Sequence, residues 1–137
     1  NLRLGLNADL GYSDGDRAEN IRRMAEVAHL FADAGLVAIV PIISPFIASR
    51  EQARKIHAAS HLRFVEVYVA TPVDECERRD PKGLYAKLRS GEMTGLSGVD
   101  AVYEAPTSPD VVVGARGESL AESVQMILTV LLTKADS

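Results

Sequence analysis

One segment constrains the fold of this 137-residue chain more than any other, the amphipathic stretch of residues 13–35. Its apolar residues recur at spacings of three and four, which places them on one face of an α-helix. They are Ile21, Met24, Ala25, Ala28, Phe31 and Ala32. Ser13 is a suitable N-cap with Asp16 three residues later, and Gly35 stands where a C′ glycine ends a helix. The sequence therefore predicts one long helix with an apolar face.

The polar side of this predicted helix carries Arg17 and Asn20 near its start. The two residues are about one turn apart, so both side chains project from the same side near the positive end of the helix dipole. An Arg and an Asn in this position can bind an anion and a ribose. A solvated charged face explains the same spacing, and spacing alone favours that simpler interpretation.

Composition limits the class of protein. The formal net charge of -4 argues against a general nucleic-acid or membrane-surface binder, and no apolar run approaches the ~20 residues that span a bilayer. We expect no signal peptide. Cys76 is the only cysteine, which excludes an internal disulfide and fits a cytoplasmic protein. The length suits a single domain over residues 1–137.

Strand and helix patterns alternate along the chain. After helical turns and a loop within residues 1–10, a continuous apolar run at 36–43 predicts a strand that is buried on both faces of a parallel sheet. Further strands are predicted at 64–70 and 110–113, and further helices at 49–60, 73–77, 84–90 and 118–133. Short connections between alternating elements predict an α/β fold, with a parallel sheet and helices on both faces.

Two places outside the long helix can carry chemistry. Ligands of parallel sheets bind beyond the carboxyl ends of the strands, which points to Ser44, although Ser44 and Pro45 can equally form a simple turn. A basic cluster surrounds the turn at residues 80–83 and suits either a mobile lid over phosphate or a solvated basic helix. Its members are Arg78, Arg79, Lys82, Lys87 and Arg89.

Other familiar sites are missing from the sequence. No G-x-x-x-x-G-K-[ST] phosphate loop occurs, because no Lys-Ser or Lys-Thr follows the glycines at 91, 95 and 98. His57 and His61 share a helix face, but no third ligand is obvious. We therefore expect surface histidines and no metal site.

Several long motifs, in uninterrupted order over residues 1–110, resemble adenylylsulfate kinase. They are N-L-R-L-G-L-N at 1–7, D-L-G-Y-S at 9–13, D-R at 16–17 with E-N-I-R-R at 19–23, A-E-V-A at 25–28, L-F-A-D-A-G-L-V at 30–37, I-S-P-F at 43–46, D-P-K-G-L-Y at 80–85 and Y-E-A-P at 103–106. The resemblance implies a three-layer α/β/α P-loop kinase. Such an enzyme uses ATP and Mg²⁺ to phosphorylate the 3′-hydroxyl of adenylyl sulfate, giving 3′-phosphoadenylyl sulfate in sulfate assimilation.

By this resemblance, five residues near the start of the chain bind substrate. Asn1 and Arg3 fall in the family's D-G-D-N-x-R segment, and Tyr12 stands where the family has an aromatic residue, usually Phe, near the adenine. Arg17 and Asn20 match the family's substrate-binding Arg and Asn. The resemblance thus replaces the interpretation of a merely solvated face.

The resemblance also assigns later residues. Ile43 and Ser44 match a pair at a strand end; Ser44 is the candidate catalytic residue and has been regarded in bacterial members as a candidate phosphoserine. Lys82 matches the lid lysine. Gly95 and Leu96 match a Gly-Phe pair whose Phe stacks on the substrate adenine.

The chain departs from the family pattern in places. Leu96 replaces the stacking Phe, Ala70 stands where a strand usually ends in Asp, and Ile47 and Ser49 alter the charges after the S-P-F motif. The family's P-loop, first strand and two aspartates are expected before Asn1. We therefore interpret the chain as the substrate-binding and lid portion of the kinase.

Two alternatives stay open. One is a non-catalytic module that binds adenylyl sulfate or dimerises without a P-loop. The other is a kinase of another nucleoside phosphate, which Leu96 suggests and which Arg17, Asn20 and Lys82 oppose. The resemblance further implies a homodimer, separate from or fused to a sulfate adenylyltransferase, with neither nucleic acid nor membrane as partner.

Overall fold

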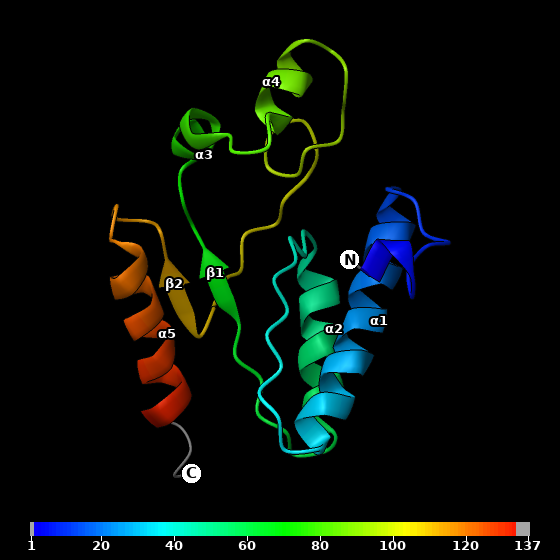
Figure 1. Cartoon of the computed structure of the whole chain (residues 1–137). Coiled ribbons are helices and arrows are strands. Elements are labelled where there is room, and N and C mark those ends of the chain that lie inside the picture. The colour runs from blue at the N-terminus through cyan, green and yellow to red at the C-terminus, as the bar shows by residue number, and fades with distance from the viewer. Residues whose placement is uncertain (1, 134–137) are drawn as a thin grey trace. The chain divides into compact units, whose positions relative to one another are not determined.

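The computed structural model describes residues 2–133, so the predicted substrate contact at Asn1 lies outside the described residues. The chain divides into two compact units (Figure 1). The first comprises Asn1–Phe64 and Val102–Ala105, and the second comprises Val65–Ala101 and Pro106–Ser137. The single domain that the length suggests stays a prediction.

The first unit contains the 3₁₀ turn η1 (Leu2–Leu4) and the helices α1 (Asp14–Asp33) and α2 (Ile47–Ala58). The predicted caps of α1 are confirmed. Ser13 Oγ accepts a hydrogen bond from the Asp16 amide at 3.2 Å, which satisfies a donor that the first turn leaves free. At the other end Gly35 has a φ of 81°, and the Leu36 amide donates to the Phe31 carbonyl at 3.0 Å. This is the Schellman arrangement that glycine favours at a helix C-terminus.

Small residues bring α1 and α2 into contact. Ile21, Ala25 and Ala28 of α1 are buried, as is Ala53 of α2. His57 is also buried, at 5% exposure, which makes the prediction of surface histidines wrong for this residue. Its Nδ1 lies 2.9 Å from the backbone oxygen four residues earlier, so the ring nitrogen is paired inside the helix.

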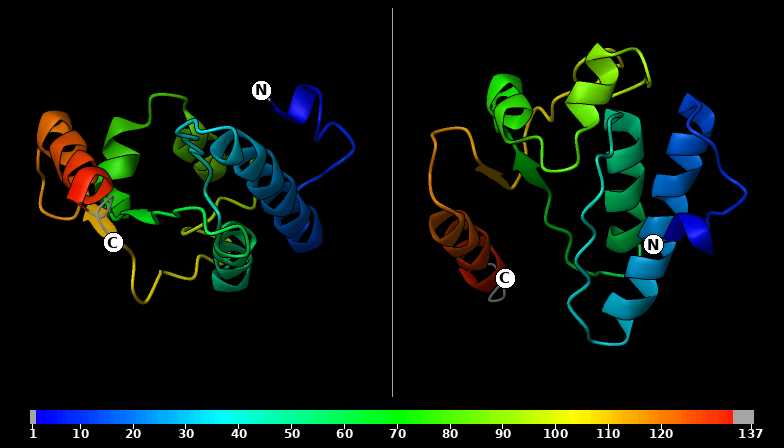
Figure 2. Two further views of the ribbon diagram at one scale, coloured as in Figure 1. Left: turned by 90° about the horizontal axis from the view of Figure 1, so that it is seen from below. Right: turned by 45° about the horizontal axis from the view of Figure 1, so that its top comes forward.

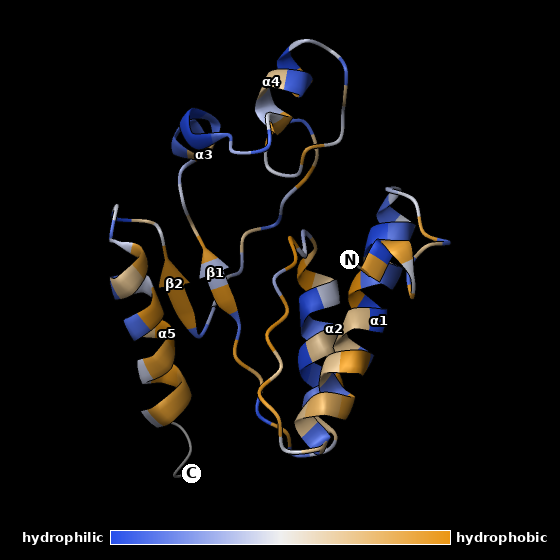
Figure 3. Ribbon diagram, in the orientation of Figure 1, coloured by the Kyte–Doolittle hydropathy of each residue, from blue (hydrophilic) through white to orange (hydrophobic). Residues whose placement is uncertain are grey.

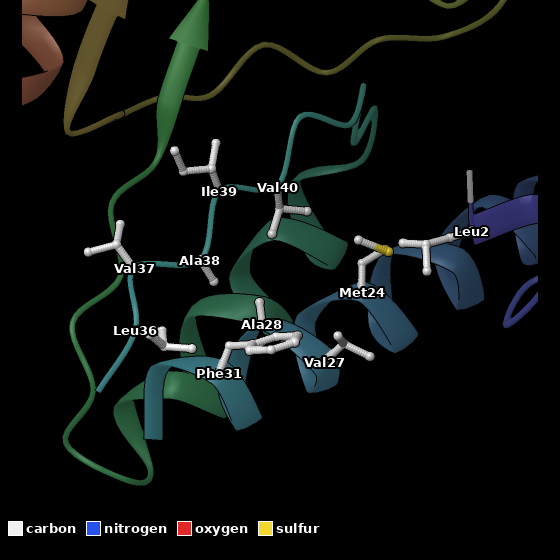
Figure 4. Close-up of a pocket in the computed structure, with 10 residues that line it drawn as sticks. All are labelled: Leu2, Met24, Val27, Ala28, Phe31, Leu36, Val37, Ala38, Ile39 and Val40. Atoms are coloured by element: carbon white, nitrogen blue, oxygen red, sulfur yellow. The ribbon is translucent and has the colours of Figure 1, made fainter. Parts of the chain in front are cut away.

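Residues 36–43 form an extended segment, and the prediction of a buried strand here is wrong within the described residues. Ala38 and Val40 point toward the helices, whereas Val37 and Ile39 point away and are 75% and 85% exposed (Figure 4). The alternation is that of a strand, but no neighbouring strand among the described residues pairs with the segment. Apolar composition predicts burial, but a ladder requires a partner as well.

This segment and α1 enclose an apolar groove of about 460 Å³. The residues that line it are Leu2, Met24, Val27, Ala28, Phe31, Leu36, Val37, Ala38, Ile39 and Val40 (Figure 4).

The second unit contains a parallel sheet, as predicted, but among the described residues this sheet has two strands and not the three that the sequence predicts. Strand β1 (Val67–Val69) pairs with β2 (Val111–Val113), with Val67 opposite Val111. Helix α5 (Leu120–Thr133) packs against β2, and the short helices α3 (Val73–Arg79) and α4 (Leu84–Arg89) follow β1 (Figure 2). The strands are apolar and α3 is hydrophilic (Figure 3). An α/β fold with a parallel sheet is therefore confirmed, with shorter strands than the sequence predicts.

Candidate functional site

Two arginines brace the loop that precedes α1. Arg3 Nη1 donates to the carbonyls of Leu10 at 3.1 Å and Gly11 at 2.8 Å. The Arg3 guanidinium also lies 4.4 Å from the centre of the Tyr12 ring, and Arg17 Nε donates to the Tyr12 carbonyl at 2.9 Å. Tyr12 is 73% exposed, so an aromatic side chain that contacts the Arg3 guanidinium is accessible to a planar anionic ligand.

Asn20 lies one turn beyond Arg17 on α1 and is half-buried. Its Oδ1 accepts a hydrogen bond from Asn7 Nδ2 at 2.9 Å. Asn7 is completely buried, and sequence reasoning did not single it out. The motif around Asn7 was matched to the family, but nothing in its spacing indicates a contact with a residue 13 positions away.

The next charged residues of α1 fasten the preceding segment to the helix. Glu19 accepts hydrogen bonds from Arg22 at 2.7 Å and from Arg23 at 2.8 Å, and these bonds lower the pKa of Glu19 to about 2. Arg23 also binds Asp9 at 2.7 Å and lowers the pKa of that carboxyl. Arg22 and Arg23 therefore have acidic protein partners and serve the local structure.

Ser44 lies before α2 in an unusual backbone conformation, with a φ of 46°. Arg50 Nη1 donates to the Ser44 carbonyl at 2.7 Å, and Arg50 Nη2 donates to the Glu104 carbonyl at 2.6 Å. The Glu104 amide donates to the Pro45 carbonyl at 2.8 Å, and Glu104 Oε2 accepts from the Ile47 amide at 2.7 Å. We call Arg50 and Glu104 the clasp, because their bonds hold the backbone at Ser44 and at the residues that follow it.

The structure brings the predicted residues of the first unit to one end of it. Helices α1 and α2 both begin at the upper end of this unit as drawn in Figure 1. Arg17 and Asn20 belong to the start of α1, while Ser44 and the exposed Ile43 precede α2. The positive ends of both helix dipoles therefore lie at the same end, where an anion is stabilised.

In the second unit, Lys82 lies in the predicted turn between α3 and α4 and is exposed. Asp80 fixes this turn. Its carbonyl accepts from the Gly83 amide at 3.0 Å, and its carboxylate accepts from the amides of Tyr85 at 3.3 Å and Ala86 at 3.1 Å. The backbone of the turn is thus held from within, and the Lys82 side chain takes no part in holding it.

The arginines of the basic cluster are neutralised by neighbouring acids. Glu75 accepts from Arg78 at 2.7 Å and from Arg79 at 2.6 Å, which lowers the pKa of Glu75 to about 2. Arg89 forms an ion pair with Glu77 of α3. Lys82 makes no ion pair with any residue in the described range 2–133, so its charge is available to a ligand.

The loop that contains Gly95 and Leu96 is closed by an acid that sequence reasoning did not single out. The Asp100 carboxylate accepts from the amides of Gly95 at 2.8 Å and Leu96 at 2.6 Å. The Leu96 carbonyl in turn accepts from the amide of Ala101 at 3.2 Å. Leu96 is half-buried in this loop, whose shape is set by backbone hydrogen bonds.

Two kinds of site are not found in the part of the chain that the structure describes. No group of three or more His, Cys, Asp or Glu side chains there is arranged to hold a metal ion. Nor does any helix in that range have the length and apolar character needed to cross a bilayer.

Comparison with known proteins gives consistent matches. The "Bifunctional enzyme NodQ" of Rhizobium sp. (strain N33) is 54% identical over 127 residues, which are 93% of this chain and 19% of that protein. The "Adenylyl-sulfate kinase" of Pseudomonas aeruginosa is 49% identical over 132 residues, 96% of this chain and 66% of that protein. The chain thus spans about a fifth of the bifunctional relative and about two thirds of the separate kinase.

A solved structure is also similar. It is the Mycobacterium tuberculosis APS kinase CysC in complex with AMPPNP and APS, with a TM-score of 0.90 and 50% sequence identity over 95% of this chain and 75% of that one. The sequence profile of the family described as adenylylsulphate kinase matches residues 1–114. With most of its length inside this profile and about half its residues identical to a solved member, the chain belongs to the adenylylsulphate kinase family.

Proposed function

We propose that this chain supplies the substrate-binding and lid part of an adenylylsulfate kinase. The reaction moves the γ-phosphoryl group of ATP to the 3′-hydroxyl of adenylyl sulfate, and the products are ADP and 3′-phosphoadenylyl sulfate. The 3′-hydroxyl oxygen forms a new bond to the γ-phosphorus, the bond between this phosphorus and the ADP oxygen breaks, and the hydroxyl proton is released to solvent. Such transfers depend mainly on positioning and on charge neutralisation.

The observation that carries this proposal is the cluster of Arg3, Tyr12, Arg17 and Asn20 before and within the first turns of α1. Adenylyl sulfate combines a planar base, a ribose and an anionic phosphate–sulfate group. The exposed Tyr12 ring suits the base, and the Arg17 guanidinium suits the anion. Asn20 then supplies an amide to the ribose or to an anion oxygen.

The remaining assignments follow from the family motifs. Ser44, next to Ile43, offers a hydroxyl at the start of α2, Leu96 packs on the adenine beside Gly95, and Lys82 neutralises phosphate charge. Asn1 is assigned with Arg3 to the substrate side. The family motifs assign these residues to adenylyl sulfate.

ATP is the proposed phosphoryl donor, and Mg²⁺ would neutralise its phosphates when bound. No acidic cluster in residues 2–133 fits a metal ion, so we assign no Mg²⁺ ligand to this chain and derive no step through the metal. The contribution of these residues is to bind and orient the acceptor. A homodimer, and association with a sulfate adenylyltransferase, are part of the proposal.

Calorimetric titration of adenylyl sulfate into the 137-residue chain tests the proposal. Arg17→Ala should weaken binding by roughly tenfold to a hundredfold, because a charge-assisted hydrogen bond contributes about 1.5–3 kcal/mol. Arg22→Ala is the matched control, since Arg22 lies on the same helix and is paired with Glu19. Absence of binding, or equal losses in the two variants, would refute the assignment.

A second candidate is a non-catalytic module that binds adenylyl sulfate and transfers no phosphoryl group. The complete gene product separates the two. A kinase forms 3′-phosphoadenylyl sulfate when ATP and Mg²⁺ are added, and Arg17→Ala lowers that rate. A binding module retains affinity for adenylyl sulfate and forms no product.

A further inference from the structure

Asn7 is the most unusual polar residue of the first unit. It is fully buried, at 0% exposure, although Asn is rarely found completely inside a protein. Its Nδ2 donates to Asn20 Oδ1 at 2.9 Å, while its own Oδ1 is buried without a hydrogen-bond partner in the described residues. A buried unsatisfied acceptor destabilises the fold, so the residue invites an explanation beyond packing.

The direction of this hydrogen bond follows from the inventory of donors and acceptors. A side-chain amide has one carbonyl oxygen and one NH₂ group, so two facing amides pair in one of two ways. In the observed arrangement, the Asn7 NH₂ group donates to Asn20, and the buried Asn7 Oδ1 has no hydrogen-bond partner in the described residues. In the reverse way, Asn7 would orphan its NH₂ instead, and buried unpaired N–H groups are rarer than under-satisfied carbonyls.

The observed direction decides what Asn20 offers to its surroundings. Its Oδ1 is occupied by Asn7, and no acceptor for its Nδ2 is found within residues 2–133. Asn20 is half-buried and lies one turn beyond Arg17, near the positive end of α1. The group left available at this position is therefore a hydrogen-bond donor.

We propose that Asn7 is a positioning residue that fixes the side-chain amide of Asn20 so that its NH₂ group faces adenylyl sulfate. This inference rests on the proposed function for the identity of the ligand. Asn20 then selects a ligand oxygen that accepts a hydrogen bond, such as a ribose hydroxyl or an oxygen of the phosphate–sulfate group, and disfavours a donor there. The contact between Asn7 and Asn20 is thus a determinant of specificity.

Two substitutions of Asn7 separate positioning from packing. Asn7→Leu keeps the size and removes the polar group, which leaves Asn20 free to rotate. Asn7→Asp keeps the shape but presents only acceptors, so it draws the Asn20 NH₂ toward itself and turns Asn20 Oδ1 to the ligand. Adenylyl sulfate affinity should fall by roughly threefold in Asn7→Leu and by more than tenfold in Asn7→Asp.

The loss of affinity should not simply follow a loss of thermal stability, because Asn7→Leu also removes the buried oxygen that has no hydrogen-bond partner. We expect Asn7→Leu to retain the wild-type midpoint within a few degrees while binding more weakly. If the two variants bind equally well, or if affinity falls only in proportion to lost stability, Asn7 has a packing role and the proposal is overturned.

A measurement on the unliganded wild-type chain decides the matter even where a variant does not fold. In ¹⁵N NMR spectra the side-chain NH₂ of Asn7 should exchange slowly with water, and that of Asn20 should exchange rapidly and shift when adenylyl sulfate is added. Protection of the Asn20 NH₂ instead would overturn the inference. Failure of the wild-type chain to bind adenylyl sulfate would refute the proposed function, whereas the exchange pattern would still report the orientation of the amide pair.

Discussion

The clasp around Ser44 leads to a quantitative prediction for Arg50. A non-glycine residue with a φ of 46° is held in a conformation that costs about 1–2 kcal/mol. Arg50 opposes this cost directly, because its guanidinium donates to the Ser44 carbonyl at 2.7 Å and to the Glu104 carbonyl at 2.6 Å. Removing the guanidinium should therefore loosen Ser44 and lower stability together.

The size of the effect follows from the exposure of the two bonds. The bond to Ser44 is partly buried, and a hydrogen bond that involves a charged group contributes about 1.5–3 kcal/mol. The bond to Glu104 is exposed, so we allow it only about 0.5 kcal/mol. Arg50→Met should lower the free energy of unfolding by about 2–3.5 kcal/mol, and Arg50→Lys, which can serve one carbonyl at a time, should lose about half of this.

Urea unfolding at pH 7 measures the difference, with Lys55→Met as the control because Lys55 is an exposed cation of the same helix. The control should change the free energy of unfolding by less than about 0.5 kcal/mol. Adenylyl sulfate affinity should also fall in Arg50→Met, since the Ser44 hydroxyl is no longer held in place. If Arg50→Met and Lys55→Met are equally stable, the clasp does not hold Ser44 and the argument fails.

Three further predictions follow from the structure. The pKa of Glu19 is lowered from 4.5 to about 2, so its ion pairs stabilise the fold above pH 4.5 and lose this effect as the pH falls toward 2. The difference in thermal unfolding midpoint between wild type and Glu19→Gln should therefore shrink between pH 4.5 and pH 2 at low salt, and a constant difference would contradict this prediction. Leu96→Phe should tighten adenylyl sulfate by roughly threefold to tenfold in calorimetry, because an aromatic contact adds about 0.5–1.5 kcal/mol, and an unchanged or weaker affinity would remove Leu96 from the adenine site. The 137-residue chain alone should form no 3′-phosphorylated product from ATP and adenylyl sulfate, and product detected by chromatography would overturn this prediction.

The long helix could be predicted because its determinants are local. The Ser13 cap, the spacing of the apolar residues and the C′ position of Gly35 all act within a few residues, and each is found in α1. Strands β1 and β2 were also predictable, since β-branched residues dominate both. Their parallel pairing followed from the alternation of strands and helices along the chain.

The segment 36–43 and His57 show where local patterns fail. Strand formation at 36–43 depends on a pairing partner, and a run of apolar residues contains no information on whether one is present. His57 was expected at the surface, yet it is buried. The centres of its ring and the Phe64 ring are 5.4 Å apart, and its Nδ1 is paired with the Ala53 carbonyl of the same helix. Burial of a titratable ring is decided by which elements pack on it, and sequence spacing does not reveal this.

In the candidate site, too, local motifs were predictable from the sequence and long-range contacts were not. Arg17, Asn20, Ser44 and Lys82 were identified from motifs, because each side chain belongs to a short stretch with a family pattern. The residues that brace them were not. Arg50 and Glu104 are 54 positions apart, and Asn7 and Asn20 are 13 apart. Asp100, which closes the Leu96 loop, accepts from backbone amides that every residue type except proline would present.

These bracing contacts share a physical feature that explains why they escaped prediction. The Arg50 and Asp100 contacts join a side chain to a main-chain carbonyl or amide, and the Asn7 contact joins two amides of the same residue type. None needs a charge pattern or a periodicity, so none leaves a signature in the sequence. They nonetheless fix the orientation of the residues that motifs do reveal. Substitution of a bracing residue should therefore alter ligand affinity with no change in any side chain that touches the ligand.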